Sequence, residues 1–459
     1  MGDRPYWNME MEPLLNTPQM REIQLKRLNP QLRLVYEKSV IQRAYMDRLG
    51  IKVDKINSVE DLQKAFPPMD KHEMRQMVLS HMGEGGIEGL LNNLLCSPLN
   101  EVVLLATTSG TTGEPTPYFF TRGDLQLMYE SIARALWRTG LRPGDVVVHA
   151  MGLSMFGGGI PAILSLVNFG VGTVPVGAES GTERVLNYLN IVKMVKGKID
   201  GVFMTPSFAE YVIDRCPELL HTDVKDLGIR RLLSGGEPGA GIDTVKKKIE
   251  GAFGCRIYDM MGLTAGFWAS CNHEEYQGMH FLSDDTCIME LIDPETKEPV
   301  PFEDGAMGEL VGTPLAGDSM NVIRFNSNDI MQVFTAPCPC GLSGVRYKVI
   351  GRSDDMLKVK GVMIYPASID NVITGFVPRV TGEFRIVLTE PPPRVVPPLK
   401  LKVEYGETVT KDTLPGLARE IQDKMHDAIK IRPEITWIPP MTLERSTHKT
   451  KFIEKAYEK

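Results

Sequence analysis

Residues 102–116 read VVLLATTSGTTGEPT, an apolar run followed directly by a loop of hydroxyls and glycines. Glycines let a backbone turn its N–H groups inward and approach an anion closely, while Thr and Ser hydroxyls supply further donors. The stretch therefore predicts a phosphate-binding loop at the end of a strand. It is not a Walker A loop, because no Gly-Lys-Ser/Thr follows. The alternative for a Ser/Thr/Gly run of this length is a flexible surface loop.

Composition limits the classes of protein that fit. A chain of 459 residues is too long for one ordinary core, which predicts two or three domains. The net charge of −7 argues against a nucleic-acid-binding surface. The N-terminus carries charges and a proline where a signal peptide needs an apolar core, and no run approaches membrane-spanning length. We therefore expect a cytoplasmic protein with neither nucleic-acid nor membrane partners.

The pattern along the chain divides it into regions. Residues 1–75 are charged and helical in pattern, which predicts an N-terminal lobe. From residue 100 onward, short β-branched runs at 146–149, 201–205, 231–234 and 256–258 alternate with helical stretches. This alternation predicts an α/β body with parallel strands, in which ligands bind at the carboxyl ends of strands.

The pattern changes again after about residue 350. Alternating apolar residues at 384–388 and 399–405 predict half-exposed strands, and residues 414–429 predict a helix before a short strand at 436–438. These elements make a small α+β domain. The predicted fold is a large multi-sheet α/β domain over residues 1–353, followed by a small mobile α+β domain over residues 354–459.

Seven motifs occur in a fixed order along the chain. They are Ser109-Gly110-Thr111-Thr112-Gly113, Arg142-Pro143-Gly144-Asp145, Thr205-Pro206-Ser207, Gly236-Glu237-Pro238, Tyr258-Asp259 with Gly262-Leu263-Thr264, Gly351-Arg352-Ser353-Asp354-Asp355-Met356-Leu357-Lys358, and Arg445-Ser446 before Lys449. In this order and spacing, they resemble the adenylate-forming acyl-CoA synthetases, and most closely the phenylacetate-CoA ligase family. The similarity runs along essentially the whole chain.

The resemblance implies a reaction and its cofactors. In that family a carboxylate attacks the α-phosphate of ATP, which gives an acyl-adenylate and pyrophosphate, and the thiol of coenzyme A then displaces AMP. The implied protein is an ATP-dependent, Mg²⁺-using ligase of an aromatic or arylacetic acid. Two alternatives stay open: an adenylating enzyme that passes its acyl group to a carrier thiol or an amine, and a catalytically silent relative that binds nucleotide or acyl-CoA. A homodimer is compatible with the resemblance.

The resemblance also implies roles for single residues. Those that would bind the nucleotide are Thr108, Ser109, Gly110, Thr111, Thr112, Gly113, Gly235, Gly236, Glu237, Pro238, Tyr258, Asp259, Asp329 and Arg352. Those that would line the acid pocket are Met151, Phe156, Gly157, Gly236 and Gly262. Thr264 and Lys449 would be catalytic, with Lys451 as the competitor of Lys449, and Asp354 would be the hinge of the small domain.

Several of these assignments have plain structural alternatives. The turn at Gly235 to Pro238 could simply end a strand, and Tyr258 could be a core residue. Arg352 and Asp354 could form an ordinary surface ion pair, which is worth about 0–1 kcal/mol.

Four residues resemble a Cys/His set that holds structural zinc in some members of the family. They are Cys271, His280, Cys338 and Cys340, and thiolates with an imidazole suit a closed tetrahedral zinc site. Buried cysteines are the alternative. His273 and Cys287 are possible substitutes within the set.

Two positions depart from the family pattern. Glu114 stands in the phosphate loop where the family usually has lysine, and it would place negative charge beside a polyanion. Ala265 stands where the family has a glutamate that helps to hold Mg²⁺. Mg²⁺ is then held differently, or adenylation is slow or lost.

Overall fold

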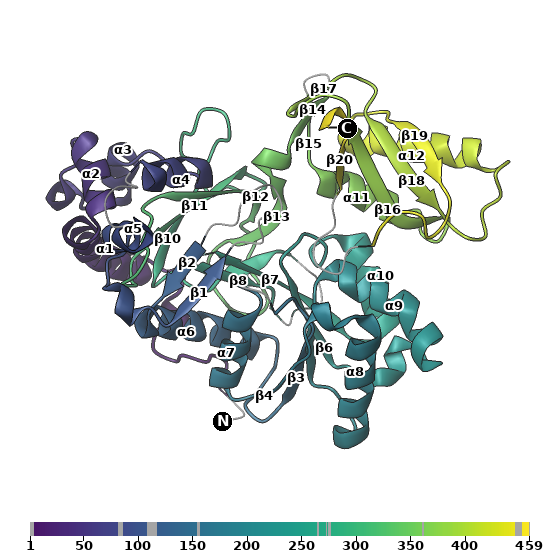
Figure 1. Ribbon diagram of the computed structural model, residues 1–459, viewed down its shortest axis with the longest axis horizontal. Helices are drawn as coiled ribbons and strands as arrows, with labels where there is room; N and C mark the ends of the chain where they lie inside the picture. The colour runs from purple at the N-terminus through teal and green to yellow at the C-terminus, as the bar shows by residue number, and fades with distance from the viewer. Residues whose placement is uncertain are drawn as a thin grey trace. The chain divides into compact units, whose positions relative to one another are not determined.

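The structure is a computed structural model that describes residues 4–80, 86–107, 117–153, 157–263, 266–271, 273, 277–359, 362–445 and 452–458. The chain divides into two compact units (Figure 1). The first unit comprises Met1–Gly177, Asp200–Phe203 and Tyr258–Lys348, and the second comprises Ala178–Ile199, Met204–Ile257 and Val349–Lys459. Within the described ranges, no helix is both long and apolar enough to cross a membrane.

Helices make up the N-terminal part of the first unit. They are η1 (Glu12–Leu14), α1 (Pro18–Lys38), α2 (Val40–Arg48), η2 (Val53–Lys55), α3 (Val59–Ala65), α4 (Lys71–Leu79), α5 (Gly86–Leu94) and η3 (Leu99–Glu101). Side-chain caps explain where several begin, since the hydroxyls of Thr17, Ser39 and Ser58 accept backbone N–H groups of α1, α2 and α3. Asp70 and Glu73 form a capping box at α4.

The large sheet supplies the first unit with its framework. Seven of its strands lie in the order β10-β11-β12-β13-β9-β8-β7. Their bounds are β7 (Arg256–Leu263), β8 (Gly266–Ala269), β9 (Met279–Phe281), β10 (Cys287–Ile292), β11 (Met307–Pro314), β12 (Phe325–Phe334) and β13 (Arg346–Arg352). Strand β3 (Val146–His149) pairs in parallel with both β4 (Gly172–Pro175) and β5 (Gly201–Phe203). A separate hairpin joins β1 (Leu104–Thr107) to β2 (Pro117–Phe120).

Helices α6 (Arg122–Arg138) and α7 (Ile160–Phe169) pack on this framework, α6 against β8 and α7 against β4 (Figure 1). The predicted α/β class is confirmed. Pairing is mixed, however, because β7 with β8, β8 with β9, β9 with β13 and β10 with β11 are antiparallel pairs. Only two residues separate β7 from β8, and so short a connection permits only a hairpin.

The second unit combines a helical layer with the C-terminal sheets. Its first part contains η4 (Ala178–Ser180), α8 (Thr182–Lys196), α9 (Pro206–Leu220), η5 (Val224–Leu227), β6 (Arg231–Gly235) and α10 (Asp243–Phe253). Its second part contains η6 (Ser353–Asp355), β14 (Leu357–Val359), β15 (Val362–Ile364), α11 (Pro366–Thr374), β16 (Val380–Leu388), β17 (Arg394–Val395), β18 (Lys400–Tyr405), α12 (Leu414–Ile429), β19 (Glu434–Ile438), β20 (Ile453–Lys455) and η7 (Ala456–Glu458).

The C-terminal strands form two small sheets, β15-β14-β17 and β19-β18-β16-β20. They share an apolar core with α11 and α12 that includes Phe384, Ile386 and Ile421, all almost fully buried. The helix predicted over 414–429 is α12 with the same bounds. Helix α11 also contacts α10, where the Thr244 and Thr374 hydroxyl oxygens lie 2.7 Å apart.

Arg324 fixes the N-terminal helices to the start of β12. Its guanidinium donates to the carbonyl of Phe66 at 2.6 Å and to both carboxylate oxygens of Glu290 at 3.1 and 3.2 Å. The backbone of Met69 pairs with the chain on either side of Phe325. The start of β12 therefore has both backbone and side-chain partners in the N-terminal helices.

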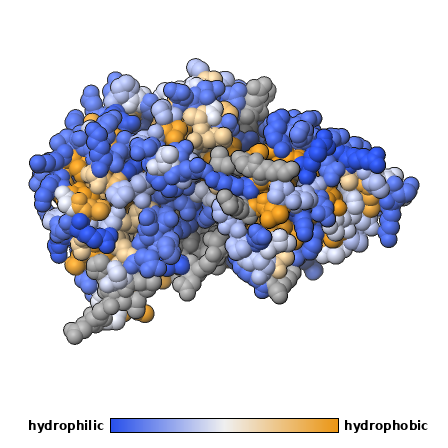
Figure 2. All heavy atoms as spheres, turned by 90° about the horizontal axis from the view of Figure 1, so that it is seen from above, coloured by the Kyte–Doolittle hydropathy of each residue, from blue (hydrophilic) through white to orange (hydrophobic). Residues whose placement is uncertain are grey.

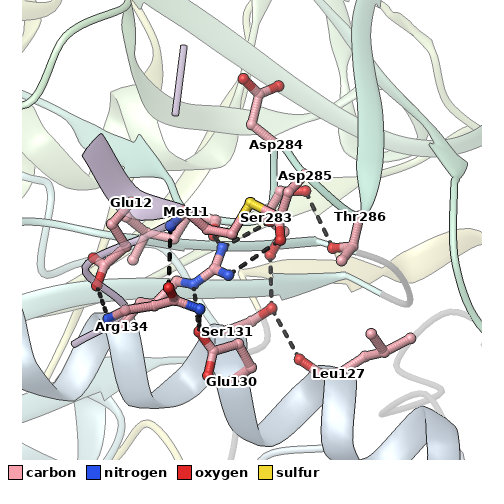
Figure 3. Close-up of polar contacts among 12 residues, drawn as sticks. Met11, Glu12, Leu127, Glu130, Ser131, Arg134, Ser283, Asp284, Asp285 and Thr286 are labelled. Carbon is pink, nitrogen blue, oxygen red and sulfur yellow. Dashed lines mark hydrogen bonds and ion pairs between the residues drawn. The ribbon is translucent and has the colours of Figure 1, made fainter. Parts of the chain in front are cut away.

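A second buried arginine joins α6 to the loop between β9 and β10 (Figure 3). Arg134 donates to both carboxylate oxygens of Asp285, at 2.7 and 3.1 Å, and to the carbonyl of Leu282 at 2.9 Å. Its Nε donates to Glu130 at 3.1 Å. The Ser283 hydroxyl donates to that of Ser131 at 3.0 Å, which ties the same two segments again.

Glu12 lies beside this network and has no exposed surface. Burial raises the pKa of Glu12, and the attraction of Arg138, whose Nη2 lies 3.3 Å away, offsets that rise only in part. Hydrophilic side chains predominate on the face drawn in Figure 2, where charged groups keep their contact with water, whereas Glu12 is fully buried.

Replacing Arg134 with alanine should lower the free energy of unfolding by about 3–5 kcal/mol, because Asp285 would keep its charge without its partner in a buried site. Urea unfolding followed by circular dichroism measures this. The control is Arg33→Ala, which removes an exposed ion pair with Asp54 in the same unit and should cost at most about 1 kcal/mol. Equal losses in the two variants would contradict the expectation.

Candidate active site and metal centre

Four predicted metal ligands come together in the first unit. Cys271 follows β8, His280 lies in β9, and Cys338 and Cys340 lie between β12 and β13. Their donor atoms all lie within 4.8 Å of one another. The Sγ atoms of Cys271 and Cys338 are 3.6 Å apart, and Nε2 of His280 is 3.3 Å from Sγ of Cys340.

These spacings fit a tetrahedral ion. Zinc binds sulfur at about 2.3 Å and nitrogen at about 2.0–2.1 Å, so two sulfur ligands lie about 3.7 Å apart and a sulfur and a nitrogen about 3.5 Å apart. Cys287 is no substitute ligand, because it is fully buried elsewhere and burial raises the pKa of its thiol to about 12. His273 also lies outside the group of four.

Local structure explains why the four donors meet. In the sheet His280 pairs with Ala269 on one side and Arg346 on the other, so both neighbouring strands fix its position. Arg346 is buried and donates to the side chain of Gln277 and to the carbonyl of Ala336. Gly341, at a φ of +84°, closes a turn onto the carbonyl of Cys338 at 3.0 Å.

The donors also influence one another electrostatically. The thiol of Cys271 donates a hydrogen bond that lowers the pKa of Cys340 to about 3. The same contact raises the pKa of Cys271. Burial lowers the pKa of His280, so its imidazole stays neutral, which is the form that binds a metal. The set has the chemistry of a thiolate-rich metal centre.

The turn predicted to hold adenine lies in the second unit, where β6 ends at Gly235. The carboxylate of Glu237 accepts the N–H of Ser207 at 2.8 Å, at the N-terminus of α9. Negative charge is stabilised at that end of a helix. Pro206 also packs against the turn, since a Cβ on Gly239 would lie 2.5 Å from the Cβ of Pro206. Two of the sequence motifs therefore hold each other in place.

The strand predicted at 256–258 extends to Leu263, so Asp259, which was expected just beyond the strand, lies inside β7 together with Tyr258. Tyr258 is 3% exposed, which agrees with the alternative that it is a core residue. The N–H of Asp259 donates to the hydroxyl of Ser270 at 2.9 Å. Gly262 is exposed near the end of the same strand. The assignment of these residues to nucleotide and substrate stays a prediction.

Asp329 lies in β12 on a well-fixed stretch of backbone. Its N–H donates to the hydroxyl of Ser327 at 3.1 Å, and the N–H of Asn328 donates to the side chain of Asn326 at 2.9 Å. Asn328 has a φ of +63°, which asparagine tolerates better than most residues. Asp329 itself is half-buried. A backbone fixed in this way suits the predicted placement of the Asp329 carboxylate on a ribose.

Arg352 and Asp354, predicted as ribose ligand and hinge, contact each other. Nε and Nη2 of Arg352 donate to the two carboxylate oxygens of Asp354 at 2.8 and 2.6 Å. This is the surface ion pair that the sequence left open as an alternative. Any role of Arg352 toward phosphate would have to share its guanidinium with Asp354.

Several predicted residues fall outside the described ranges. These are Thr108 to Gly113 and Glu114 in the phosphate loop, Phe156, Thr264, Ala265, Lys449 and Lys451. Met151, predicted to line the acid pocket, is buried just beyond β3, and Gly157 is exposed. The ends of the phosphate loop are close together, since Thr107 and Pro117 are paired across β1 and β2.

Glu404 is a residue that sequence reasoning missed. It is fully buried at the end of β18 and accepts the N–H groups of Thr442 and Leu443 at 3.1 and 2.9 Å. Both terminal nitrogens of Arg445 also donate to it, at 2.8 and 2.5 Å. Burial raises its pKa, but the hydrogen bonds and charge of Arg445, together with the N–H of Leu443, outweigh burial, and the pKa is lowered.

The contacts of Glu404 with residues 442–445 fix the chain before residue 446. After residue 451 the carbonyl of Phe452 accepts the N–H of Ile386 at 2.7 Å. Both approaches to Lys449 are thus anchored on the C-terminal sheet. A single glutamate in an alternating strand carries no signal of this role in the sequence.

Comparison with known proteins places the chain in a class. Residues 34–316 match the model of the AMP-binding enzyme family, and residues 361–455 match that of the AMP-binding enzyme C-terminal domain. The chain therefore belongs to the AMP-binding enzyme family.

Individual relatives extend this likeness over nearly the whole chain. A phenylacetate-coenzyme A ligase of Thermus thermophilus is 27% identical over 458 residues, which cover 95% of this chain and 97% of the relative. One from Aromatoleum evansii is 27% identical over 447 residues, 95% of each chain. Among solved structures, 2-hydroxyisobutyryl-CoA ligase in its postadenylation state with 2-HIB-AMP superposes with a TM-score of 0.88 at 25% identity, covering 100% of this chain and 94% of that one. Within its family the protein is an AMP-forming acid–CoA ligase.

Proposed function

We propose that the protein activates an aromatic or arylacetic acid to its acyl-adenylate and then to its coenzyme A thioester. The observation that carries this proposal is the 27% identity to the Thermus thermophilus phenylacetate-coenzyme A ligase over 95% of the chain. The structural likeness to 2-hydroxyisobutyryl-CoA ligase supports the same two-step chemistry with a smaller acid. The substrates are the acid, ATP and coenzyme A, with Mg²⁺ as the cofactor that adenylate-forming ligases use.

The chemistry has two displacements. A carboxylate oxygen forms a bond to the α-phosphorus of ATP, and pyrophosphate leaves. The sulfur of coenzyme A then bonds to the acyl carbon, loses its proton, and AMP leaves. Protein groups mainly have to stabilise negative charge that develops at phosphate. In this proposal Lys449 supplies positive charge to the first step, and Asp329 and the turn at Gly235 to Pro238 hold the nucleoside.

The proposed function is tested by pyrophosphate release. We expect release that depends on an added acid, strongest with phenylacetate among a panel that includes benzoate and 2-hydroxyisobutyrate, and thioester formation when coenzyme A is added. Release without any thioester would favour transfer to another acceptor. ATP binding with no release for any acid would favour a catalytically silent protein, for which the changes at Glu114 and Ala265 would be the reason.

Replacing Lys449 with alanine should slow adenylation at least about 100-fold, the usual cost of removing one group that stabilises charge in a transition state. Thioester formation from supplied acyl-adenylate should stay within a few-fold of wild type. Single-turnover kinetics of the two half-reactions measure this. Lys451→Ala is the matched control, and a loss of adenylation in that variant alone would transfer the role to Lys451.

We further propose that Cys271, His280, Cys338 and Cys340 hold a structural zinc ion. Three cysteine sulfurs and one imidazole nitrogen at the distances described support this, and a closed set of four protein ligands leaves no position for a substrate. The ion would link the ends of β8 and β9 to the connection between β12 and β13. Zinc would thus add to stability and take no part in the chemistry.

We expect the purified protein to contain about one zinc ion per chain by elemental analysis. Cys340→Ser removes one ligand of a closed site, so this variant should lose most of the zinc. Its Tm should fall below that of the wild type, by about 2–4 °C for each kcal/mol of stability that is lost. Cys255→Ser, a half-buried cysteine outside the group, should change neither zinc content nor Tm. Wild-type protein without zinc would end the proposal.

A further inference from the structure

His149 is the last residue of β3 and is fully buried. Its carbonyl accepts the N–H groups of Val176 and Gly177, at 3.0 and 3.1 Å, just beyond β4. On the other side His149 pairs with Phe203 of β5, and the N–H of Ala150 donates to the carbonyl of Phe203 at 2.8 Å. Neighbours on both sides therefore hold the backbone at His149.

The imidazole of His149 contacts a carbonyl nine residues further along the chain. Nε2 lies 2.8 Å from the oxygen of Gly158. A carbonyl can only accept, so Nε2 must carry the hydrogen. The ring of Phe203 stacks on the imidazole, with 5.5 Å between ring centroids and 12° between planes, and this contact fixes the plane in which Nε2 points.

The hydrogen bond reaches the end of the connection between β3 and α7, where Gly157, Gly158 and Gly159 follow one another. Glycine has more accessible backbone conformations than any other residue, so a contact that fixes one of these glycines restricts more conformations than it would elsewhere. Helix α7 begins directly afterwards, and its N-cap residue Gly159 offers no side-chain cap. The hydrogen bond from His149 acts on this end of the connection, one residue before the N-cap of α7.

We propose that His149 is a positioning residue for acid binding. It acts through the connection between β3 and α7, which carries Met151 and Gly157, and it does not touch the substrate. The inference rests on the proposed function, because those two residues were assigned to the acid pocket only by resemblance. Through the bond from His149 to Gly158, the fixed end of β3 sets how deep an acid can enter that pocket.

The side chains on the connection between β3 and α7 explain why its position should affect acid binding. Methionine and leucine, at 151 and 153, form an adaptable apolar wall that can repack around acids of different size. The bond from His149 limits that adaptation by fixing where the connection ends. Loss of the bond should therefore weaken acid binding and reduce the preference for one size of acid, while ATP binding stays the same.

A matched pair of variants tests the bond itself. His149→Gln keeps an N–H donor four bonds from Cα, as Nε2 of histidine is, so it should still reach Gly158. His149→Asn is equally polar but one bond shorter and should not. His426→Asn, at an exposed position on α12, controls for loss of a histidine. The measurements are KM for acid and for ATP, kcat, and hydrogen–deuterium exchange of the peptide spanning 150–165.

We expect His149→Asn to raise the KM for acid about tenfold, which is the effect of one hydrogen bond of about 1.4 kcal/mol, with the KM for ATP within twofold of wild type. The ratio of kcat/KM between large and small acids should fall, and exchange in the 150–165 peptide should rise about tenfold. His149→Gln should restore all of these to within about threefold of wild type.

Equal KM values in the two variants, or an equal rise in the KM for acid and ATP, would overturn the proposal. If wild-type protein activates no acid, the proposed function fails, and exchange alone decides about the bond: faster exchange in His149→Asn but not in His149→Gln supports it. If His149→Asn does not fold, Phe203→Leu decides, since it removes the stacked ring and should raise the KM for acid at least threefold. An unchanged KM in that variant overturns the proposal.

Discussion

The bidentate contact between Arg134 and Asp285 is the interaction on which much of the first unit depends. It joins a long helix to the loop between two strands of the large sheet, and Glu130 and the carbonyl of Leu282 satisfy the remaining donors. Such a pair gains little over a well-packed apolar contact, but removal of one partner is expensive. It therefore fixes how α6 lies on the sheet more than it adds to stability.

Charged side chains also tie other segments of the chain together. Arg324 ties the N-terminal helices to the strand of Asp329, Glu404 ties the chain before residue 446 to the C-terminal sheet, and Glu237 ties a turn to the start of α9. Each is a charged group that makes at least one hydrogen bond to a backbone atom distant in the sequence. Chemistry that depends on placing charge near phosphate benefits from such rigid supports.

Contacts of this kind could not be predicted from the sequence, whereas other features could. Periodicity predicted α12 with its observed bounds, and the order of motifs predicted the family, because both signals are local or collinear. The length of β7 was underestimated, since Asp259 and Gly262 belong to residue types that are depleted in strands. The roles of Arg134, Glu404 and His149 depend on partners that only the folded chain brings together. The contact between Arg352 and Asp354 was foreseen only as an alternative.

The contact between Gly239 and Pro206 has a consequence for how sequences of this kind can change. A side chain on Gly239 would need both a left-handed φ, here +153°, and the space that Pro206 occupies. Proline at the first position of α9 in turn fits because its ring starts the helix without needing a donor. A side chain at position 239 is therefore excluded while Pro206 keeps its place. In an evolving lineage we expect any change at Gly239 to require a change at Pro206, 33 positions earlier in the sequence.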